Sequence, residues 1–221
     1  MMEDIKPKRI IKNKLFPSNG DISIWNKLLI DDETVSYISL PEDAEKITKI
    51  LLSYCKNINL DPSEITITDA TAGAGGNVLS FSKSFKNVNA IEIDAKRYQF
   101  LTNNIDVYKI TNVNHYCDDC LNLVYKLYHD IVFVDPPWGG KDYKEKCDLR
   151  LKISSYNIES ICLKIIDNMY SKFIPKFIAL KLPKNYDLKY LYDNLNIGNT
   201  TIFLHNLGKM FLVIICVNNY E

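Results

Sequence analysis

The chain has 221 residues and carries 27 Lys and Arg against 27 Asp and Glu, so its formal net charge at pH 7 is zero. This balance argues against a protein that coats DNA or an anionic membrane through bulk charge, but it leaves room for a small, locally basic nucleic-acid site. Hydrophobic residues make up 47% of the chain and charged residues 24%, which is ordinary for a globular domain and excludes extensive disorder.

The sequence favours an intracellular protein, in the cytoplasm or the nucleus. No apolar run approaches the roughly 18 residues that span a bilayer, and the first residues lack the apolar core of a secretory signal. The six cysteines are spread from Cys55 to Cys216, unlike a disulfide framework, so we expect reduced thiols.

Residues 1–35 are predicted to form a basic N-terminal arm, and residues 36–221 a single domain. The arm begins with several lysines and is then broken by Pro17, Asn19 and Gly20. A helical pattern follows from Pro41, where apolar residues recur at steps of three and four up to Tyr54.

From residue 65 onward, predicted strands alternate with predicted helices. The strands are expected at 65–69, 88–93, 113–116, 130–134 and 177–182, and the helices at 78–85, 98–108, 161–169 and 188–195. A hairpin of 200–205 and 210–217 closes the chain around Asn206-Leu207-Gly208. This alternation predicts an α/β fold, in which a mostly parallel sheet is covered by helices on both faces.

Ligands of such sheets bind beyond the carboxyl ends of the strands. The first such end carries DATAGAGGN (69–77), an acidic residue followed by a glycine-rich turn. The glycines let the backbone pass close to a ligand, although a tight strand-to-helix turn is the alternative explanation. The spacing is GxGG rather than the GxGxxG of dinucleotide sites, and Asp69 would repel a phosphate. It suits a positively charged ligand, such as the amino and sulfonium groups of S-adenosylmethionine.

Two further strand ends carry acidic residues. In IEID (91–94), Asp94 can accept hydrogen bonds from ribose hydroxyls, or else it is a solvated strand end. In CDDC (117–120), Asp119 can accept from an adenine amino group. A metal or redox role for the two cysteines is rejected, because no second ligand pair stands at zinc spacing.

The most informative segment is DPPWGGKDY (135–143). Pro136 and Pro137 remove backbone donors, so the carbonyls before them are rigid acceptors without a competing donor, which suits an exocyclic amine. Trp138 follows as a flat surface on which a base can stack. The alternative is a rigid turn with a buried tryptophan.

The ordered motifs DATAGAGG, AIEID, CDD and DPPW resemble those of class I S-adenosylmethionine-dependent methyltransferases. Within them, PPWGGxDY (Pro136–Tyr143) resembles the signature of the trimethylguanosine synthase family, which methylates N2 of the 7-methylguanosine cap of RNA. Segments 37–47, 90–110 and 182–187 are similar to other parts of that family. The resemblance covers the chain from about Tyr37 onward. It implies a Rossmann-like fold with a mostly parallel seven-stranded sheet and a C-terminal antiparallel hairpin.

The resemblance also implies roles for individual residues. S-adenosylmethionine would be the cofactor, no metal would be needed, and the methyl group would pass directly to the amine. The implied cofactor-binding residues are Asp69, Thr71, Gly73, Gly75, Asp94 and Asp119, and the implied catalytic residues are Asp135, Pro136, Pro137 and Trp138. Trp138 would stack on 7-methylguanine, Lys184 would meet the cap phosphates, and Lys12 and Lys14 of the arm can help to bind the triphosphate.

Three positions depart from the family pattern and keep other functions open. Asp135 replaces the usual Ser before Pro-Pro, Asp118 replaces a Gly, and Lys184 replaces an Arg that binds phosphate through two parallel hydrogen bonds. One alternative is an amino-methyltransferase acting on adenine N6 or internal guanine N2 of DNA, rRNA or tRNA. Another is a catalytically silent methyltransferase fold that serves as an RNA-binding subunit.

Overall fold

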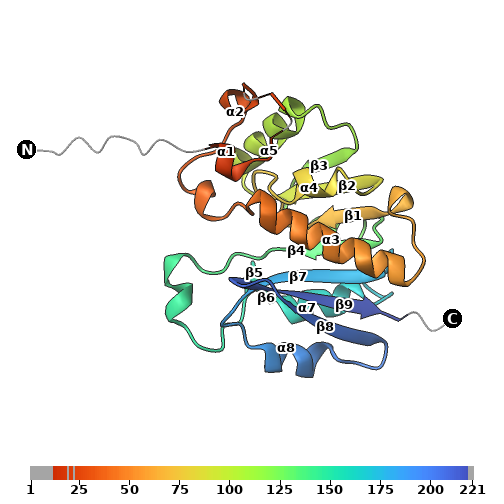
Figure 1. The fold of residues 1–221 in the computed structure, drawn as a ribbon. Coiled ribbons are helices and arrows are strands. Elements are labelled where there is room, and N and C mark those ends of the chain that lie inside the picture. Colours follow the sequence, from red (N-terminus) through yellow and green to blue (C-terminus); the bar gives the residue numbers. More distant parts are fainter. Residues whose placement is uncertain (1–11, 19, 22, 219–221) are drawn as a thin grey trace, which may run out of the picture.

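The parallel sheet predicted from the sequence is the centre of the computed structural model, which describes residues 12–18, 20–21 and 23–218 (Figure 1). It has seven strands in the order β3-β2-β1-β4-β7-β9-β8. The strands are β1 (Thr66–Asp69), β2 (Asn87–Glu92), β3 (Val113–Cys117), β4 (Ile131–Val134), β7 (Phe177–Pro183), β8 (Thr200–Asn206) and β9 (Met210–Val217). The first five run parallel, and β9 is antiparallel to both β7 and β8. The predicted fold class, including its closing hairpin, is confirmed.

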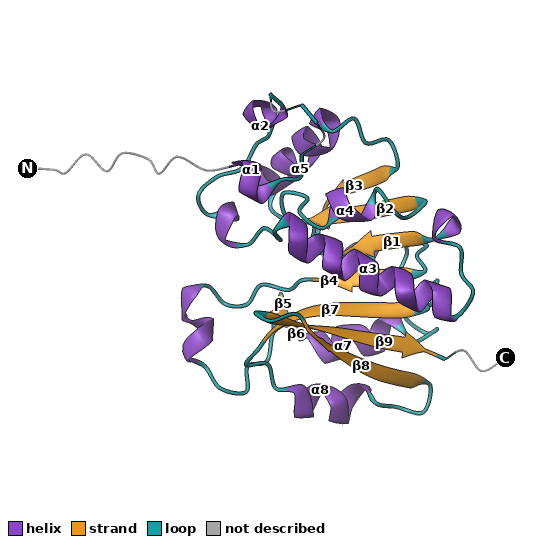
Figure 2. Ribbon diagram, in the orientation of Figure 1, coloured by secondary structure: helices purple, strands orange, loops and turns teal. Residues whose placement is uncertain are grey.

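Helices cover both faces of the sheet (Figure 2). One face packs against α3 (Pro41–Asn57), α4 (Val78–Phe81) and α5 (Ala95–Val107), and the other against α6 (Cys120–Leu123), α7 (Ile158–Ile165) and α8 (Leu188–Leu195). Alternate residues of a strand point to opposite faces. In β7, Phe177 and Ala179 therefore join the core under α3, whereas Ile178 and Leu180 join the core under α7.

Short polar residues begin the helices at the carboxyl ends of the strands. Asp94 accepts a hydrogen bond from Arg97 N and caps α5, and Asp119 accepts from Leu121 N and caps α6. Pro41 stands in the first turn of α3, where its missing N–H leaves no donor unsatisfied. Because these strands run parallel, the loops that follow their carboxyl ends lie along one edge of the sheet.

Two predicted helices are shorter than the sequence suggested. α4 ends at Phe81, although the pattern extends to residue 85. α7 ends at Ile165, and Met169 is 88% exposed, because Asp167 accepts a hydrogen bond from Met169 N and turns the chain. The remaining elements are too short to leave a periodic signal: α1 (Lys12–Leu15), α2 (Ile24–Lys27), η1 (Thr34–Ser36), η2 (Pro62–Glu64), η3 (Lys141–Glu145), β5 (Lys152–Ile153) and β6 (Tyr156–Asn157).

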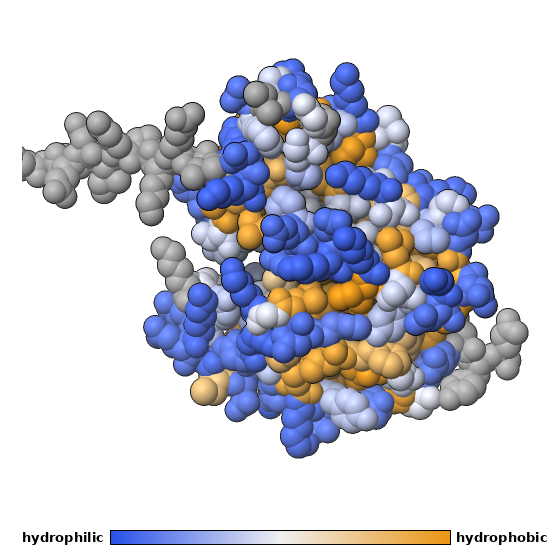
Figure 3. Space-filling model, viewed as in Figure 1, coloured by the Kyte–Doolittle hydropathy of each residue, from blue (hydrophilic) through white to orange (hydrophobic). Residues whose placement is uncertain are grey.

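The part of the predicted arm that begins at residue 12 packs against the domain. Phe16 and Leu28 are buried together with Leu79 of α4, and Tyr108 OH donates a hydrogen bond to Pro17 O. The basic residues among 1–11 lie outside the described part of the chain. At one edge of the sheet, apolar residues gather on the surface around β8 and β9 (Figure 3). Phe203 and Leu204 of β8 are exposed. Among the described helices, we find none that is long and apolar enough to cross a membrane.

Candidate active site

The predicted site residues meet at the edge of the sheet where the parallel strands end. Asp135 N donates a hydrogen bond to Thr71 Oγ1 at 2.8 Å, which ties the end of β4 to the glycine loop after β1. Gly73 N donates to Glu92 Oε2 at 2.8 Å, which ties the same loop to the end of β2. The motifs that follow these three strands therefore form one continuous rim.

The glycine loop needs its glycines for two different reasons. Gly73 and Gly75 have φ values of +56° and +99°, which lie in a region that side chains disfavour. A Cβ on Gly76 would lie 2.7 Å from Ser39 O, so this glycine permits the segment before α3 to cross the loop. At Gly73 a Cβ would meet nothing within 4 Å, so its backbone borders open space.

Asp69 is fully buried beneath this loop. Its Oδ1 accepts a hydrogen bond from Thr71 N at 3.1 Å, whereas its Oδ2 has no partner among the described residues. The pKa of Asp69 is raised to about 8, mainly by burial and also by the neighbouring carboxylates of Asp135 and Glu92, against the opposing effects of the hydrogen bond from Thr71 N and of Lys181. An unsatisfied carboxylate oxygen in this place fits a ligand that brings positive charge or an amino donor.

The structure places Glu92, rather than the predicted Asp94, against the glycine loop. Glu92 ends β2, and only 8% of its side chain is exposed. Its two oxygens accept from Gly73 N and Asp94 N, and Arg97 Nε lies 3.3 Å from Oε1. The Asp94 side chain is 43% exposed and caps α5. Both acids belong to the same IEID motif, but Glu92 holds the inner position.

Asp119 lies at the end of the neighbouring strand β3. Its Oδ2 accepts a hydrogen bond from Ser154 Oγ at 3.2 Å, in the turn between β5 and β6. Of the two cysteines around it, Cys117 is exposed and Cys120 is buried, and both are free thiols. No cluster of three or more His, Cys, Asp or Glu that could hold a metal occurs within the described ranges.

Asp135 is paired with a lysine that the sequence analysis did not select. Lys181 Nζ lies 2.5 Å from Asp135 Oδ2 and 2.8 Å from Ser39 Oγ. Ser39 Oγ in turn accepts a hydrogen bond from Asn77 Nδ2. Burial raises the pKa of Asp135, and the Lys181 ammonium opposes that rise. The sequence offered one signal that could have identified Lys181: it is a lysine within an apolar run predicted to be a buried strand. A buried charge requires a partner, so such a lysine is expected to form an ion pair.

The residues after Asp135 turn outward from the sheet. Pro136 is buried, Pro137 is exposed, and Trp138 is half-buried. The indole meets the Tyr143 ring edge to face, with centroids 5.2 Å apart, and Lys181 Nζ lies 5.6 Å from its centroid. Its Nε1 is shielded and has no partner in the part of the chain that the structure describes. Trp138 therefore lies at the rim of the site and not in the interior.

Two of the three basic residues expected to meet phosphates, Lys184 and Lys12, have protein partners. Lys184 Nζ donates to Asn206 Oδ1 at 2.6 Å and lies 4.0 Å from the Phe211 centroid, so it is held against the β8–β9 hairpin. Lys12 Nζ donates to Leu28 O, and Lys14 is exposed.

Asn104 of α5 is a second residue that sequence reasoning missed. It is fully buried, and its Nδ2 donates to Ala74 O in the glycine loop and to Leu29 O in the N-terminal segment. Its Oδ1 accepts from Leu29 N. One amide thus joins the N-terminal segment to the floor of the site.

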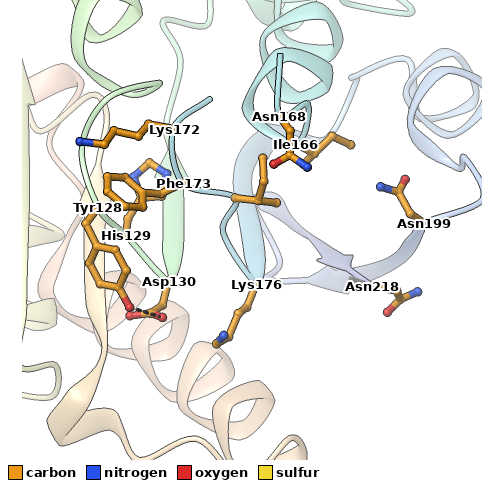
Figure 4. Close-up of a pocket in the computed structure, with 11 residues that line it drawn as sticks. Tyr128, His129, Asp130, Ile166, Asn168, Lys172, Phe173, Lys176, Asn199 and Asn218 are labelled. Atoms are coloured by element: carbon orange, nitrogen blue, oxygen red, sulfur yellow. Dashed lines mark hydrogen bonds between the residues drawn. The ribbon is translucent and has the colours of Figure 1, made fainter. Parts of the chain in front are cut away.

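A cavity of about 620 Å³ lies away from this rim, at the amino ends of β4 and β7 (Figure 4). Tyr128, Asp130 and Lys176 are among its lining residues. None of the predicted site residues lines it, so the cavity is separate from the candidate site.

The sequence is similar to a known protein family and to individual proteins. Residues 64–220 match the family model described as RNA cap guanine-N2 methyltransferase. An uncharacterized protein L320 of Acanthamoeba polyphaga mimivirus is 38% identical over 93% of this chain and 85% of its own length. Trimethylguanosine synthase of Schizosaccharomyces pombe is 29% identical over 68% of this chain and 63% of its own length.

Solved structures share the fold at low sequence identity. Precorrin-6y C5,15-methyltransferase from Geobacter metallireducens is 13% identical, has a TM-score of 0.59 and aligns over 88% of this chain and 95% of its own. SMU.1697c, a putative methyltransferase from Streptococcus mutans in complex with SAH, is 16% identical, has a TM-score of 0.52 and aligns over 76% of this chain and 97% of its own.

Proposed function

This chain belongs to the RNA cap guanine-N2 methyltransferase family, and we propose that it transfers methyl groups from S-adenosylmethionine to N2 of the 7-methylguanosine cap of RNA. The observation that carries this proposal is the junction of two motifs at one rim. The hydrogen bond from Asp135 N to Thr71 Oγ1 sets the DPPW segment directly beside the glycine loop. A bound base and a bound methyl donor would therefore meet there.

The residues of the glycine loop fit the cofactor. When bound, S-adenosylmethionine supplies a methyl group activated by attachment to a sulfonium. The unpartnered Oδ2 of Asp69 can accept from a cationic or amino group, and Gly73 borders the space in which the methionine end would lie. Glu92 and Asp94 are the candidates for the ribose hydroxyls, and Asp119 is the candidate for the adenine amino group.

Trp138 and the two backbone carbonyls that precede the prolines would position the substrate base. The exposed part of the half-buried indole offers a surface for stacking, and 7-methylguanine is cationic, so a cation–π attraction adds to the stacking energy. The carbonyls of Asp135 and Pro136 precede proline nitrogens, and they would accept hydrogen bonds from the exocyclic amine. Lys184, together with the arm, would meet the phosphates of the cap.

Catalysis would come from placement and electrostatics. Alignment of the amine with the sulfur–methyl axis can contribute several kcal/mol. Negative charge at Asp135 and the carbonyl dipoles complement the positive charge that develops on nitrogen. The proton of N2 then leaves to Asp135 or to water. No histidine stands at the rim: His115 and His205 bond to Tyr98 and Tyr54, and His129 is buried beside Thr68.

The test is incubation with radiolabelled S-adenosylmethionine and matched cap analogues. We expect label in the 7-methylguanosine cap analogue and none in the unmethylated analogue, because only the methylated base is cationic. Asp135, which replaces the family's serine, favours a second candidate: methylation of internal guanine N2 or adenine N6. Uncapped RNA and DNA oligonucleotides therefore form the second arm, and label confined to them would replace the cap proposal. Failure to bind the cofactor would favour a silent RNA-binding subunit.

A further inference from the structure

A buried ion pair stands behind the rim of the site. The Lys181 side chain is 7% exposed and that of Asp135 is 14% exposed, and Nζ lies 2.5 Å from Oδ2. The two residues occupy neighbouring strands: Val134 pairs with Leu180, so Asp135 and Lys181 stand one step further along the same register. The pairing of β4 with β7 therefore brings the two side chains together.

The surroundings of this pair are mainly acidic. Asp69 at the end of β1 interacts electrostatically with Asp135, with Glu92 of β2 and with Lys181 of β7. From the segment before α3, Ser39 Oγ accepts a hydrogen bond from the same ammonium. Lys181 therefore supplies positive charge among three acidic residues, and it forms its ion pair with Asp135.

A lone carboxylate in this position would tend to become neutral. Removal of one partner from a buried ion pair leaves an uncompensated charge. A buried carboxylate without its partner becomes protonated, because burial favours the neutral form. A protonated Asp135 would carry no negative charge and would present a donor to an amine that also donates. Such a group would oppose methyl transfer rather than assist it.

We infer that Lys181 is a positioning residue of the methyl-transfer site. Its ammonium group holds the Asp135 side chain in place and ionised, so that Asp135 can accept a hydrogen bond from the substrate amine. This inference rests on the proposed function. In the transfer, the lone pair of the amine nitrogen forms the bond to the methyl carbon, and the sulfur keeps the electrons of the bond that breaks. The proton released from nitrogen goes to water, because protonation of Asp135 would break its ion pair.

The test compares the pH dependence of kcat in four proteins at saturating cofactor. The wild type is compared with Lys181→Met, with the double variant Asp135→Ser/Lys181→Met, and with Lys176→Met as a matched control at the opposite edge of the sheet. We expect Lys181→Met to be at least about tenfold slower than the wild type near pH 6.5 and to approach it near pH 9, since activity falls tenfold for each unit below the pKa of an essential carboxylate.

The other variants separate this role from a merely structural one. Lys176→Met is expected to follow the wild-type profile. The double variant has neither buried charge, so it is expected to lose the acidic limb and to melt at a higher temperature than Lys181→Met. A loss of activity in Lys181→Met that is equal at every pH, or no loss, would overturn the inference.

A second readout does not depend on turnover. In carbon-13 NMR of the aspartate carboxyls, the Asp135 signal, identified by its absence after Asp135→Ser, is expected to titrate at higher pH in Lys181→Met than in the wild type. An unchanged titration would overturn the inference by itself. If the wild type methylates no cap analogue, the proposed function fails, and this titration still decides whether Lys181 controls the charge of Asp135.

Discussion

The backbone N–H of Gly73 donates a hydrogen bond to Glu92 Oε2 at 2.8 Å, so the last residue of β2 supports the glycine loop that follows β1. The same carboxylate accepts from Asp94 N through its other oxygen. Glu92 therefore holds two turns that border the proposed cofactor site, and it lies closer to the glycine loop than the aspartate predicted for the ribose.

Replacement of Glu92 by Gln is expected to weaken the binding of S-adenosylmethionine by at least about tenfold, or roughly 1.4 kcal/mol. A glutamine can accept only through one oxygen, and its amide group would face one of the two backbone donors. Isothermal titration calorimetry measures the affinity. Asp94→Asn is the control, because asparagine also caps helices. A larger loss in Asp94→Asn than in Glu92→Gln would favour Asp94 as the ribose ligand.

Asp69 is expected to make the ligand-free protein less stable as the pH rises. Its pKa is about 8 in the folded protein against an ordinary value of 3.8, so folding favours the neutral form. Its contribution to the free energy of unfolding is full below the unfolded pKa and is lost as the pH rises through about 8. The Tm of the wild type should fall more steeply over this range than that of Asp69→Asn. Parallel curves in differential scanning calorimetry would contradict this.

The same group predicts a proton-linked affinity for the cofactor. If a cationic group binds beside Asp69 Oδ2, binding favours the ionised carboxylate and releases a proton. The affinity of the wild type should rise with pH up to about 8, whereas that of Asp69→Asn should be lower and flatter. Calorimetry in two buffers of different ionisation enthalpy measures the proton released. Absence of release in the wild type would place the cationic group elsewhere.

Trp138→Ala is expected to lower kcat/KM on a 7-methylguanosine-capped RNA by roughly 100-fold, since base stacking and cation–π attraction together contribute about 2–3 kcal/mol. The affinity for S-adenosylmethionine should stay nearly unchanged, because the cofactor residues lie on the adjoining loops. Trp138→Phe keeps an aromatic face and should retain most of the activity. Equal losses in the two variants would indicate that the indole serves packing against Tyr143 instead.

Asn104→Ala is expected to destabilise the protein by about 2–4 kcal/mol, because buried backbone groups of Leu29 and Ala74 would lose their partner. Chemical denaturation measures the change. Asn103→Ala is the control on the same helix: its Nδ2 donates to Lys27 O at a more exposed position and to Asn104 Oδ1, which keeps its bond from Leu29 N, so the cost should stay below about 1 kcal/mol. Equal costs would mean that the buried bridge contributes little.

Much of the fold could be read directly from local patterns. The β-branched run before Asp69 predicted β1, because such side chains favour strands. The apolar run before Asp135 predicted β4, because fully buried parallel strands read as continuous apolar runs. The helix through Leu101 and Ile105 followed from its spacing. The four-residue helix α6 and the two-residue strand β5 were not predicted, because each holds about one period of its pattern or less.

Local sequence patterns were enough to predict the succession of strands and helices along the chain and the motifs at the strand ends, since both depend on neighbours within a few residues. The three-dimensional fold was needed to show which side chains meet: Lys181 and Asp135 are 46 residues apart, and their contact depends on the register between β4 and β7. It also placed Glu92, and not Asp94, against the glycine loop. β2 ends at Glu92, whereas Asp94 already caps α5, and the pattern of letters does not say where the strand stops and the helix begins.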